Sequence, residues 1–328
     1  MREDRHKSIK VTNAPRGIGR LPISQICAVG TLPDAADDGI DVIWKDVTFC
    51  SVSQMTALAA VQLAAHEAGV VQGYALPESD ACSYMLRMDY CRVLGIETEE
   101  GFVRHDPVGR FVPLSTIPID EVQADPGGIA DKLEEVVSRN TSLHRSASNM
   151  LNLSVMEVID NVVQHSNAKS PGLACAQYYA GQKFVEMCVA DCGVGIPASM
   201  EENPLYSSLT PWERMEAAFK PGTGQWYGRS GLGGHMVSGG VGLSYVCKLA
   251  ARLGGHVWTV SGQEAIHIGS NGTEKVDGLY YPGTVMVIRI PDTPVEVLES
   301  DIFDDGKPVP VYWDGTDGIH CDNGGILW

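Results

Sequence analysis

The feature that most constrains the fold is a helix, an apolar strand and an acidic, glycine-rich turn that follow in order in the second half of the chain. Residues 149–164 carry apolar side chains at helical spacing, and Glu157 and Asn161 fall on one face of the predicted helix. Residues 184–190 form an apolar run that predicts a strand, and the turn that begins at Asp191 follows it.

The pair on the predicted helix suits metal-assisted phosphate chemistry. Asn161 offers an amide oxygen, a hard neutral ligand of the kind that Mg²⁺ accepts alongside its waters. Glu157 lies one turn earlier on the same face, where a carboxylate can act as a general base toward a water that attacks a γ-phosphate. An amphipathic helix with a polar edge is the alternative interpretation of the same spacing.

The turn suits recognition of a flat ring that carries an amine. An ionised Asp191 can accept a hydrogen bond from an exocyclic amine such as that of adenine. Gly193 and Gly195 permit positive φ and let the backbone approach a ring closely. An ordinary turn at the end of a strand is the alternative.

A third motif, GGVGLS at residues 239–244, opens a helix predicted over residues 241–253. Backbone N–H groups at the start of a helix bind phosphate well. The motif is neither a P-loop, because the chain has no GxxxxGK, nor a dinucleotide fingerprint, because Tyr245 stands where that fingerprint needs glycine. Residues 220–238 are so rich in glycine that they predict a mobile lid, in which Lys220 is a cation for phosphate oxygens or a solvated loop residue.

The order and spacing of these motifs resemble the GHKL superfamily of ATP-binding domains, which includes gyrase B, heat-shock chaperone, sensor histidine kinase and mismatch-repair ATPases. The resemblance covers roughly residues 130–292, and the segments that carry it are EVIDN at 157–161, DCGVGIP at 191–197, GGVGLSYV at 239–246 and Gly283-Thr284. It implies a two-layer α/β sandwich of the Bergerat type with a mixed sheet.

The resemblance also implies roles for single residues. Glu157 would be the catalytic base or water-orienting residue, Asn161 the Mg²⁺ ligand and Asp191 the adenine-reading carboxylate, which Thr284 supports. ATP and Mg²⁺ are the implied cofactors, and the full set of residues expected to bind the nucleotide is Asp191, Gly193, Gly195, Gly240, Gly242, Leu243, Thr284, His165 and Lys220.

His165 bears on the subtype. It follows Asn161 by four residues, and this N-x-x-x-H pattern is similar to the anti-sigma-factor serine kinases. That likeness implies a serine/threonine protein kinase in a regulatory, partner-switching-like system. A residue at the end of a helix that bonds only to backbone is the alternative for His165, and an ATP-gated protein-binding module with little or no turnover is the alternative function.

The first third of the chain predicts a small α/β unit. Its expected elements are a strand at 40–44, a helix at 53–68, a strand at 70–76 and a helix at 79–94. Residues 46–53 and the helix after them resemble the STAS, or anti-sigma-antagonist, pattern. Val52 stands where that pattern has its phosphorylatable serine, so the resemblance implies a fixed docking or dimerisation surface without a phosphate switch.

These patterns divide the chain of 328 residues into five expected parts. They are a flexible N-terminus at 1–20, a STAS-like module at 21–117, a linker at 118–128, the ATP-binding domain at 129–292 and an acidic tail at 293–328.

The composition of the chain limits the classes of molecule that it is expected to bind. A net charge of −17 argues against general affinity for nucleic acid or an anionic membrane. No apolar run spans a bilayer and no secretory signal is recognisable, so we expect a cytoplasmic protein with reduced cysteines. The expected partners are ATP and a protein partner or substrate, and the chain can form a homodimer.

Overall fold

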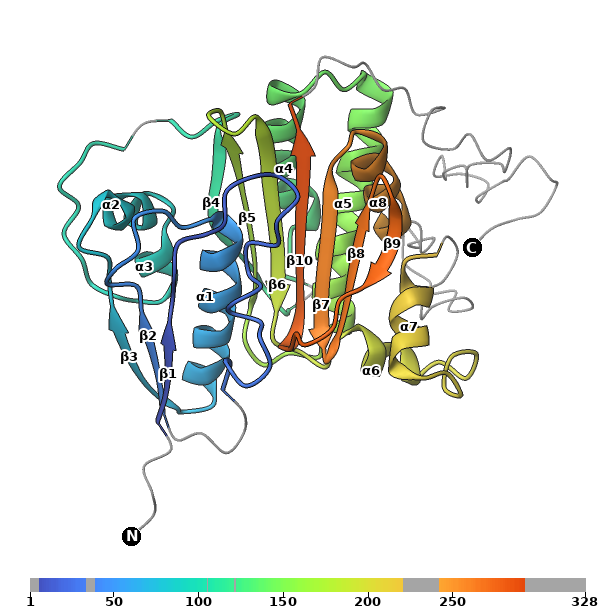
Figure 1. Cartoon of the computed structure of the whole chain (residues 1–328), viewed down its shortest axis with the longest axis horizontal. Coiled ribbons are helices and arrows are strands. Elements are labelled where there is room, and N and C mark those ends of the chain that lie inside the picture. The colour runs from blue at the N-terminus through green and yellow to red at the C-terminus, as the bar shows by residue number, and fades with distance from the viewer. Residues whose placement is uncertain (1–5, 34–38, 105, 121, 221–241, 293–328) are drawn as a thin grey trace, which may run out of the picture.

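The computed structural model describes residues 6–33, 39–104, 106–120, 122–220 and 242–292. The expected tail at 293–328, most of the expected lid and Gly240 lie outside these residues. Two sheets and the helices between and beside them make up the described part (Figure 1). None of the helices in those ranges has the length and apolarity to cross a membrane.

The larger sheet has seven strands in the order β4-β5-β6-β10-β7-β8-β9, and every neighbouring pair is antiparallel. The expectation of a mixed sheet is therefore wrong here, because β10 enters between β6 and β7 and runs against both. The strands are β4 Phe111–Ile117, β5 Gly172–Tyr179, β6 Phe184–Asp191, β7 His256–Gly262, β8 Glu264–Gly269, β9 Gly272–Lys275 and β10 Tyr281–Pro291.

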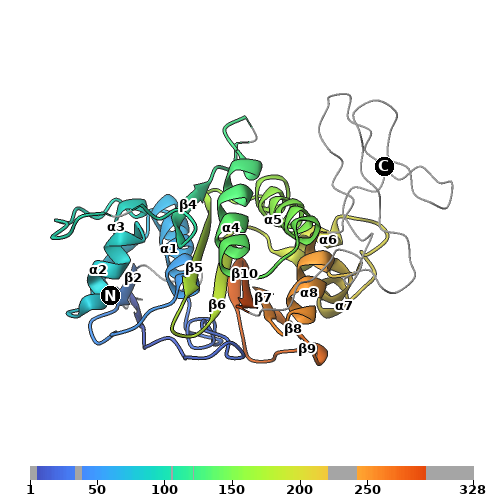
Figure 2. The same cartoon turned by 90° about the horizontal axis from the view of Figure 1, so that it is seen from above.

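Three helices cover one face of this sheet, which we call the helix face: α4 Pro126–Asn140, α5 Arg145–His165 and α8 Gly242–Arg252 (Figure 2). Alternate residues of the central strands, such as Met187 on β6 and Met286 on β10, join the core beneath these helices. Two shorter helices, α6 Ile196–Glu201 and α7 Pro211–Ala218, follow β6.

The N-terminal unit has three parallel strands in the order β1-β2-β3. Its elements are β1 His6–Lys10, α1 Val52–Glu67, α2 Asp80–Arg87, α3 Tyr90–Val93, β2 Gly39–Ile43 and β3 Val71–Ala75. The expected flexible N-terminus is wrong for residues 6–10, because Ile9 is buried and the segment pairs with β2. The single helix expected at 79–94 is also divided, since Asp89 adopts a left-handed φ of 61° between α2 and α3.

Helix α1 is buried on all sides from Val52 to Gln62, because it lies between the small sheet and the face of the large sheet opposite the helix face (Figure 1). We call that second face the module face. A helix enclosed in this way needs no charged side, and its buried stretch is made of small and apolar residues with a few uncharged polar ones. The N-terminal unit and the large sheet thus share one hydrophobic core. The expected domain boundary is wrong in two places. Strand β4 lies within the residues expected for the N-terminal module but belongs to the large sheet, and α4 begins at Pro126, inside the expected linker.

An enclosed ion pair joins the two units on the module face. Glu186 and Arg289 are directly opposite each other on β6 and β10, both side chains are at most 2 % exposed, and they lie 2.6 Å apart. Glu186 also accepts hydrogen bonds from the backbone N–H and the hydroxyl of Ser53, at the start of α1. The Arg289 guanidinium donates to the carbonyls of Gly17 and Arg20. The residues around Val52, for which the sequence resemblance implied a docking surface, are therefore buried, and that expectation is wrong for them.

We expect Glu186→Leu to lower the free energy of unfolding by about 3–5 kcal/mol, because it leaves the Arg289 charge buried without its partner. Urea unfolding followed by circular dichroism measures the change. Glu78→Gln, which removes one partner of the exposed Lys45–Glu78 pair, is the control and should cost no more than about 1 kcal/mol. A loss for Glu186→Leu as small as that of the control would contradict a structural role for the buried pair.

Candidate functional site

The carboxylate of Asp191 lies at the end of β6 and is the first part of the site. Strand pairing places Thr284 of β10 opposite Asp191, and Ser261 of β7 opposite Thr284. Each of the three stands an even number of residues from a core residue of the helix face, so its side chain is on that same face. Together they form a polar row across the sheet at one end of the helix face. The hydroxyls of Ser261 and Thr284 are 2.9 Å apart.

The turn after Asp191 is pressed against the end of α5. The Gly193 N–H donates to Asp191 Oδ1 at 2.8 Å, and the Val194 N–H donates to the carbonyl of Ser166 at 2.7 Å. A Cβ on Gly193 would lie 1.9 Å from that carbonyl oxygen, so only glycine fits. Gly195 has a φ of +80°, which also favours glycine.

Burial raises the pKa of Asp191 to about 6, while hydrogen bonds from the backbone of Gly193 and Thr284 act in the opposite direction. The side chain is only 5 % exposed. At neutral pH the residue is thus ionised but poorly solvated, which makes it a strong hydrogen-bond acceptor for a ligand that reaches it.

The start of α8 meets α5 at Glu157. The backbone N–H of Gly242 donates to Glu157 Oε2 at 2.6 Å. A Cβ on Gly242 would lie 2.7 Å from Glu157 Cβ and 3.1 Å from the Ser154 carbonyl oxygen, so the glycine lets the two helices touch. Leu243, the next residue, is partly buried against the core of the helix face. The structure therefore brings together Glu157, Gly242 and Leu243, which the sequence predicted from separate motifs.

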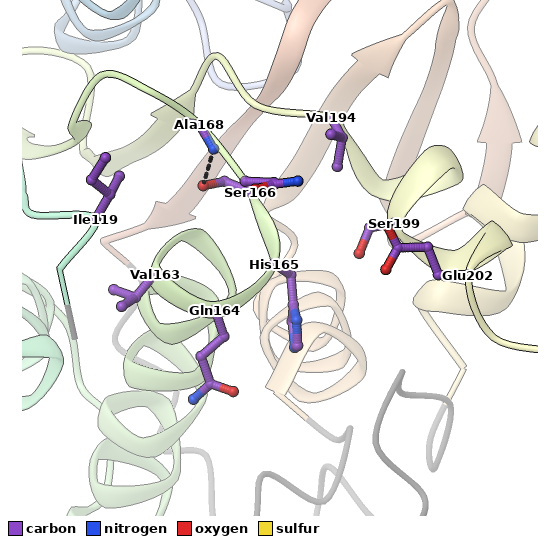
Figure 3. A pocket seen from close by; sticks show the side chains of 10 residues that line it. Ile119, Val163, Gln164, His165, Ser166, Ala168, Val194, Ser199 and Glu202 are labelled. Carbon is purple, nitrogen blue, oxygen red and sulfur yellow. Dashed lines mark hydrogen bonds between the residues drawn. The ribbon is translucent and has the colours of Figure 1, made fainter.

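Asn161 and His165 continue the line from Glu157 along α5, one turn apart, and both are half-buried. His165 lines a pocket of about 340 Å³ at the end of α5, and Glu202 lines it from the end of α6 (Figure 3). Burial lowers the pKa of His165, although the charges of Asp160 and Glu202 and a backbone hydrogen bond oppose this. The imidazole is therefore neutral at pH 7.

The pocket adjoins the Asp191 turn without containing Asp191. Ser166 and Val194, which are hydrogen-bonded to each other through their backbones, belong to the pocket wall and to the turn at once. The other lining residues are Ile119, Val163, Gln164, Asn167, Ala168 and Ser199. The pocket is thus a polar extension of the site beyond the end of α5.

For two of the residues predicted to bind the nucleotide, the described part of the structure does not test the expected role. Lys220 follows α7, is well exposed and forms an ion pair with Glu216 at 3.4 Å, so its expected contact with phosphate stays a prediction. Gly240 is outside the described ranges. Sequence reasoning missed Ser261, whose hydroxyl accepts from the Ile196 N–H and donates to the Gly283 carbonyl. A single serine at the end of a strand gives no local signal, because its partners come from other strands.

A comparison with known protein families matches residues 147–294 to the histidine kinase-, DNA gyrase B- and HSP90-like ATPase family. No curated protein and no solved structure matches the chain. Residues 147–294 are therefore a GHKL-type ATPase domain, of a class that binds and hydrolyses ATP, usually with Mg²⁺. The match begins inside α5, so β4, α4 and the N-terminal unit lie outside it.

We expect Asp191→Asn to stabilise the folded protein at pH 7.5. The folded pKa of about 6 lies above the ordinary value of 3.8, so the folded state binds the extra proton and loses stability as the pH rises through this interval. The full penalty, present above pH 6, is about 3 kcal/mol. Melting temperatures at pH 5.0 and 7.5 measure it.

The control is Asp46→Asn, which makes the same chemical change at an exposed position. The gain for Asp191→Asn should be larger at pH 7.5 than at pH 5.0. An equal gain at both, or none, would show that burial does not penalise the ionised carboxylate.

Proposed function

We propose that this protein binds ATP with Mg²⁺ and hydrolyses it or transfers its γ-phosphoryl group, as a regulatory enzyme of the serine/threonine protein kinase type. The observation that carries the proposal is the placement of two polar centres along one helix, α5, one near its middle and one at its C-terminal end. The Asp191 turn meets the end of α5 at Ser166, and Glu157 meets the start of α8 at Gly242. Both centres belong to the matched ATPase domain.

The spacing suits an extended nucleotide. Glu157 and His165 are eight residues apart, which is roughly 12 Å along α5 at the rise of an α-helix. A base whose amine donates to Asp191 would lie beside the end of α5, and its phosphates would extend toward Gly242. No side chain beyond hydrogen is tolerated at Gly193 or Gly242, because a Cβ at either position would clash with Ser166 or with Glu157, so the backbone at both places packs closely against α5.

The residues fit the ion as well as the nucleotide. The half-buried residue Asn161 lies between Glu157 and His165 on α5, and its carboxamide would give Mg²⁺ one neutral oxygen. Mg²⁺ usually takes few protein ligands and completes its shell with water and phosphate oxygens. Bound there, the ion would neutralise charge on the phosphates. Glu157 would take the proton from the attacking water or hydroxyl group.

The kinase assignment rests on the N-x-x-x-H likeness to anti-sigma-factor serine kinases. A protein hydroxyl is the proposed acceptor, and the STAS-like unit is the proposed regulatory element. His165, in the wall of the pocket, would be an uncharged hydrogen-bonding group near the adenine ring.

One observation favours a second candidate, an ATP-gated binding module with little turnover. Glu157 Oε2 accepts the hydrogen bond of the Gly242 N–H, the very type of group that would otherwise face a phosphate. A carboxylate engaged in this way holds α8 to α5, and nucleotide binding would have to compete with that contact. Such competition is the basis of an order switch for a partner surface.

Glu157→Gln distinguishes the two. The glutamine oxygen can still accept from Gly242, but it cannot take a proton, so turnover should fall by about 10²–10⁴-fold while ATP affinity stays nearly unchanged. Incubation with γ-labelled ATP and Mg²⁺ shows whether label passes to water, to the protein itself or to an added protein. Glu135→Gln, which removes one partner of the half-exposed Arg139–Glu135 pair on α4, is the control and should behave as the wild type. A low turnover that Glu157→Gln leaves unaltered would support the binding module.

Base recognition should depend on pH. Below pH 6 the Asp191 carboxylate takes up a proton and stops serving as an acceptor for the adenine amine, so affinity for adenosine should fall about tenfold for each further pH unit. Calorimetry at pH 7.5, 6.0 and 5.0 measures this, and adenosine carries no titrating phosphate. Inosine, which lacks the amine, is the matched control ligand and should bind weakly throughout. A flat adenosine affinity across this range would remove Asp191 from base recognition.

A further inference from the structure

Strand β10 is irregular directly beneath the Asp191 turn. Its register against β7 shifts between Tyr281 and Thr284, and Gly283 there has a φ of +130°. A Cβ on Gly283 would lie 2.2 Å from the Asp191 carbonyl oxygen and 2.6 Å from Cys192 Cα. The start of β10 is therefore in direct contact with the turn that carries the site's carboxylate. Irregularities of this kind re-aim side chains.

Here the irregular segment presents side chains to both faces of the sheet. Thr284 joins the polar row on the helix face, while Tyr281 is fully buried in the core of the module face. The Tyr281 hydroxyl donates to the carbonyl of Ala57, in the middle of α1, at 2.9 Å. The same hydroxyl receives a contact from Cys192 Sγ at 3.9 Å, and Cys192 directly follows Asp191 in the chain.

The anchor of this contact is rigid. Ala57 lies inside the stretch of α1 that is buried on all sides, and the start of α1 is tied to Glu186 through Ser53. A tyrosine bonded to such a helix cannot shift without breaking a buried hydrogen bond or moving the helix. Tyr281, and with it the irregular segment under Asp191, is therefore tied to the N-terminal unit as well as to its strand partner Gly262 on β7.

We propose that α1 is a positioning part of the nucleotide site, and that Tyr281 is the residue through which it holds the Asp191 turn in place for the base. The proposal rests on the function proposed above. It assigns to the N-terminal unit a direct effect on base recognition, through Tyr281 as a positioning residue that does not itself touch the nucleotide. Removal of the hydroxyl should loosen the turn, so that Asp191 meets the adenine amine less often in the right geometry.

The chain contains a matched control. Tyr179 also hydrogen-bonds to the backbone of α1, since its hydroxyl accepts from the Val52 N–H at 3.0 Å. It is paired with Phe184, at the other end of β6 from Asp191. Tyr179→Phe thus removes the same hydroxyl from the same helix, far from the site.

The test compares ATP and GTP binding by calorimetry for the wild type, Tyr281→Phe and Tyr179→Phe. Tyr281→Phe should raise the Kd for ATP at least about fivefold, the lower end of ordinary coupling between sites, and should reduce the preference for ATP over GTP. Tyr179→Phe should leave both quantities unchanged. Both variants should melt somewhat earlier than the wild type, so a purely structural role for Tyr281 would lower its melting temperature and nothing else.

Each outcome has one meaning. Wild-type affinity and ATP preference in folded Tyr281→Phe would overturn the positioning role while the proposed function stands. Equal losses in both variants would also overturn it, because the effect would then be one of general stability. A wild-type chain that binds no adenine nucleotide would overturn the proposed function, and the positioning role with it. Should Tyr281→Phe fail to fold, Cys192→Ala removes the hydroxyl's contact on the side of the site and carries the same expectation.

Discussion

The pairing of β6 with β10 is the constraint on which the rest of the structure depends. A single register places Asp191 opposite Thr284 on the helix face and Glu186 opposite Arg289 on the module face. Because side chains alternate between the two faces of a sheet, a slip of one residue would exchange these sets and bury each in the wrong core. The candidate site and the attachment of the N-terminal unit are therefore two consequences of the same strand pair.

Around that pair, α5 organises the helix face. Its buried side packs on the sheet, and its polar edge carries Glu157, Asn161 and His165 in line. The two ends of this edge are attached by backbone contacts to two different segments, the turn after β6 and the start of α8. Both attachments require glycine, so the glycines of the motifs serve close packing of backbone as well as any ligand.

The sequence predicted what local patterns determine. The helix expected at 149–164 is α5, and the strand expected at 184–190 is β6. The spacing of Glu157 and Asn161 follows from helix geometry alone. Features that depend on distant partners could not be predicted from local patterns. For example, β1 is a largely polar segment that forms a strand by pairing with β2. The predicted domain boundary was also wrong at β4. This strand precedes the expected linker in the chain but pairs with β5, at the edge of the large sheet.

The module face also bears on how this protein can be dissected. The matched segment 147–294 resembles a self-sufficient domain in sequence, but the far side of its sheet includes Trp258, Val285 and Val287 beneath α1. A fragment cut at residue 147 would present this apolar surface, together with the charges of Glu186 and Arg289, to water. Such a fragment would leave the module face of its sheet uncovered and would tend to aggregate. Fragments that contain the matched domain should therefore retain the N-terminal unit.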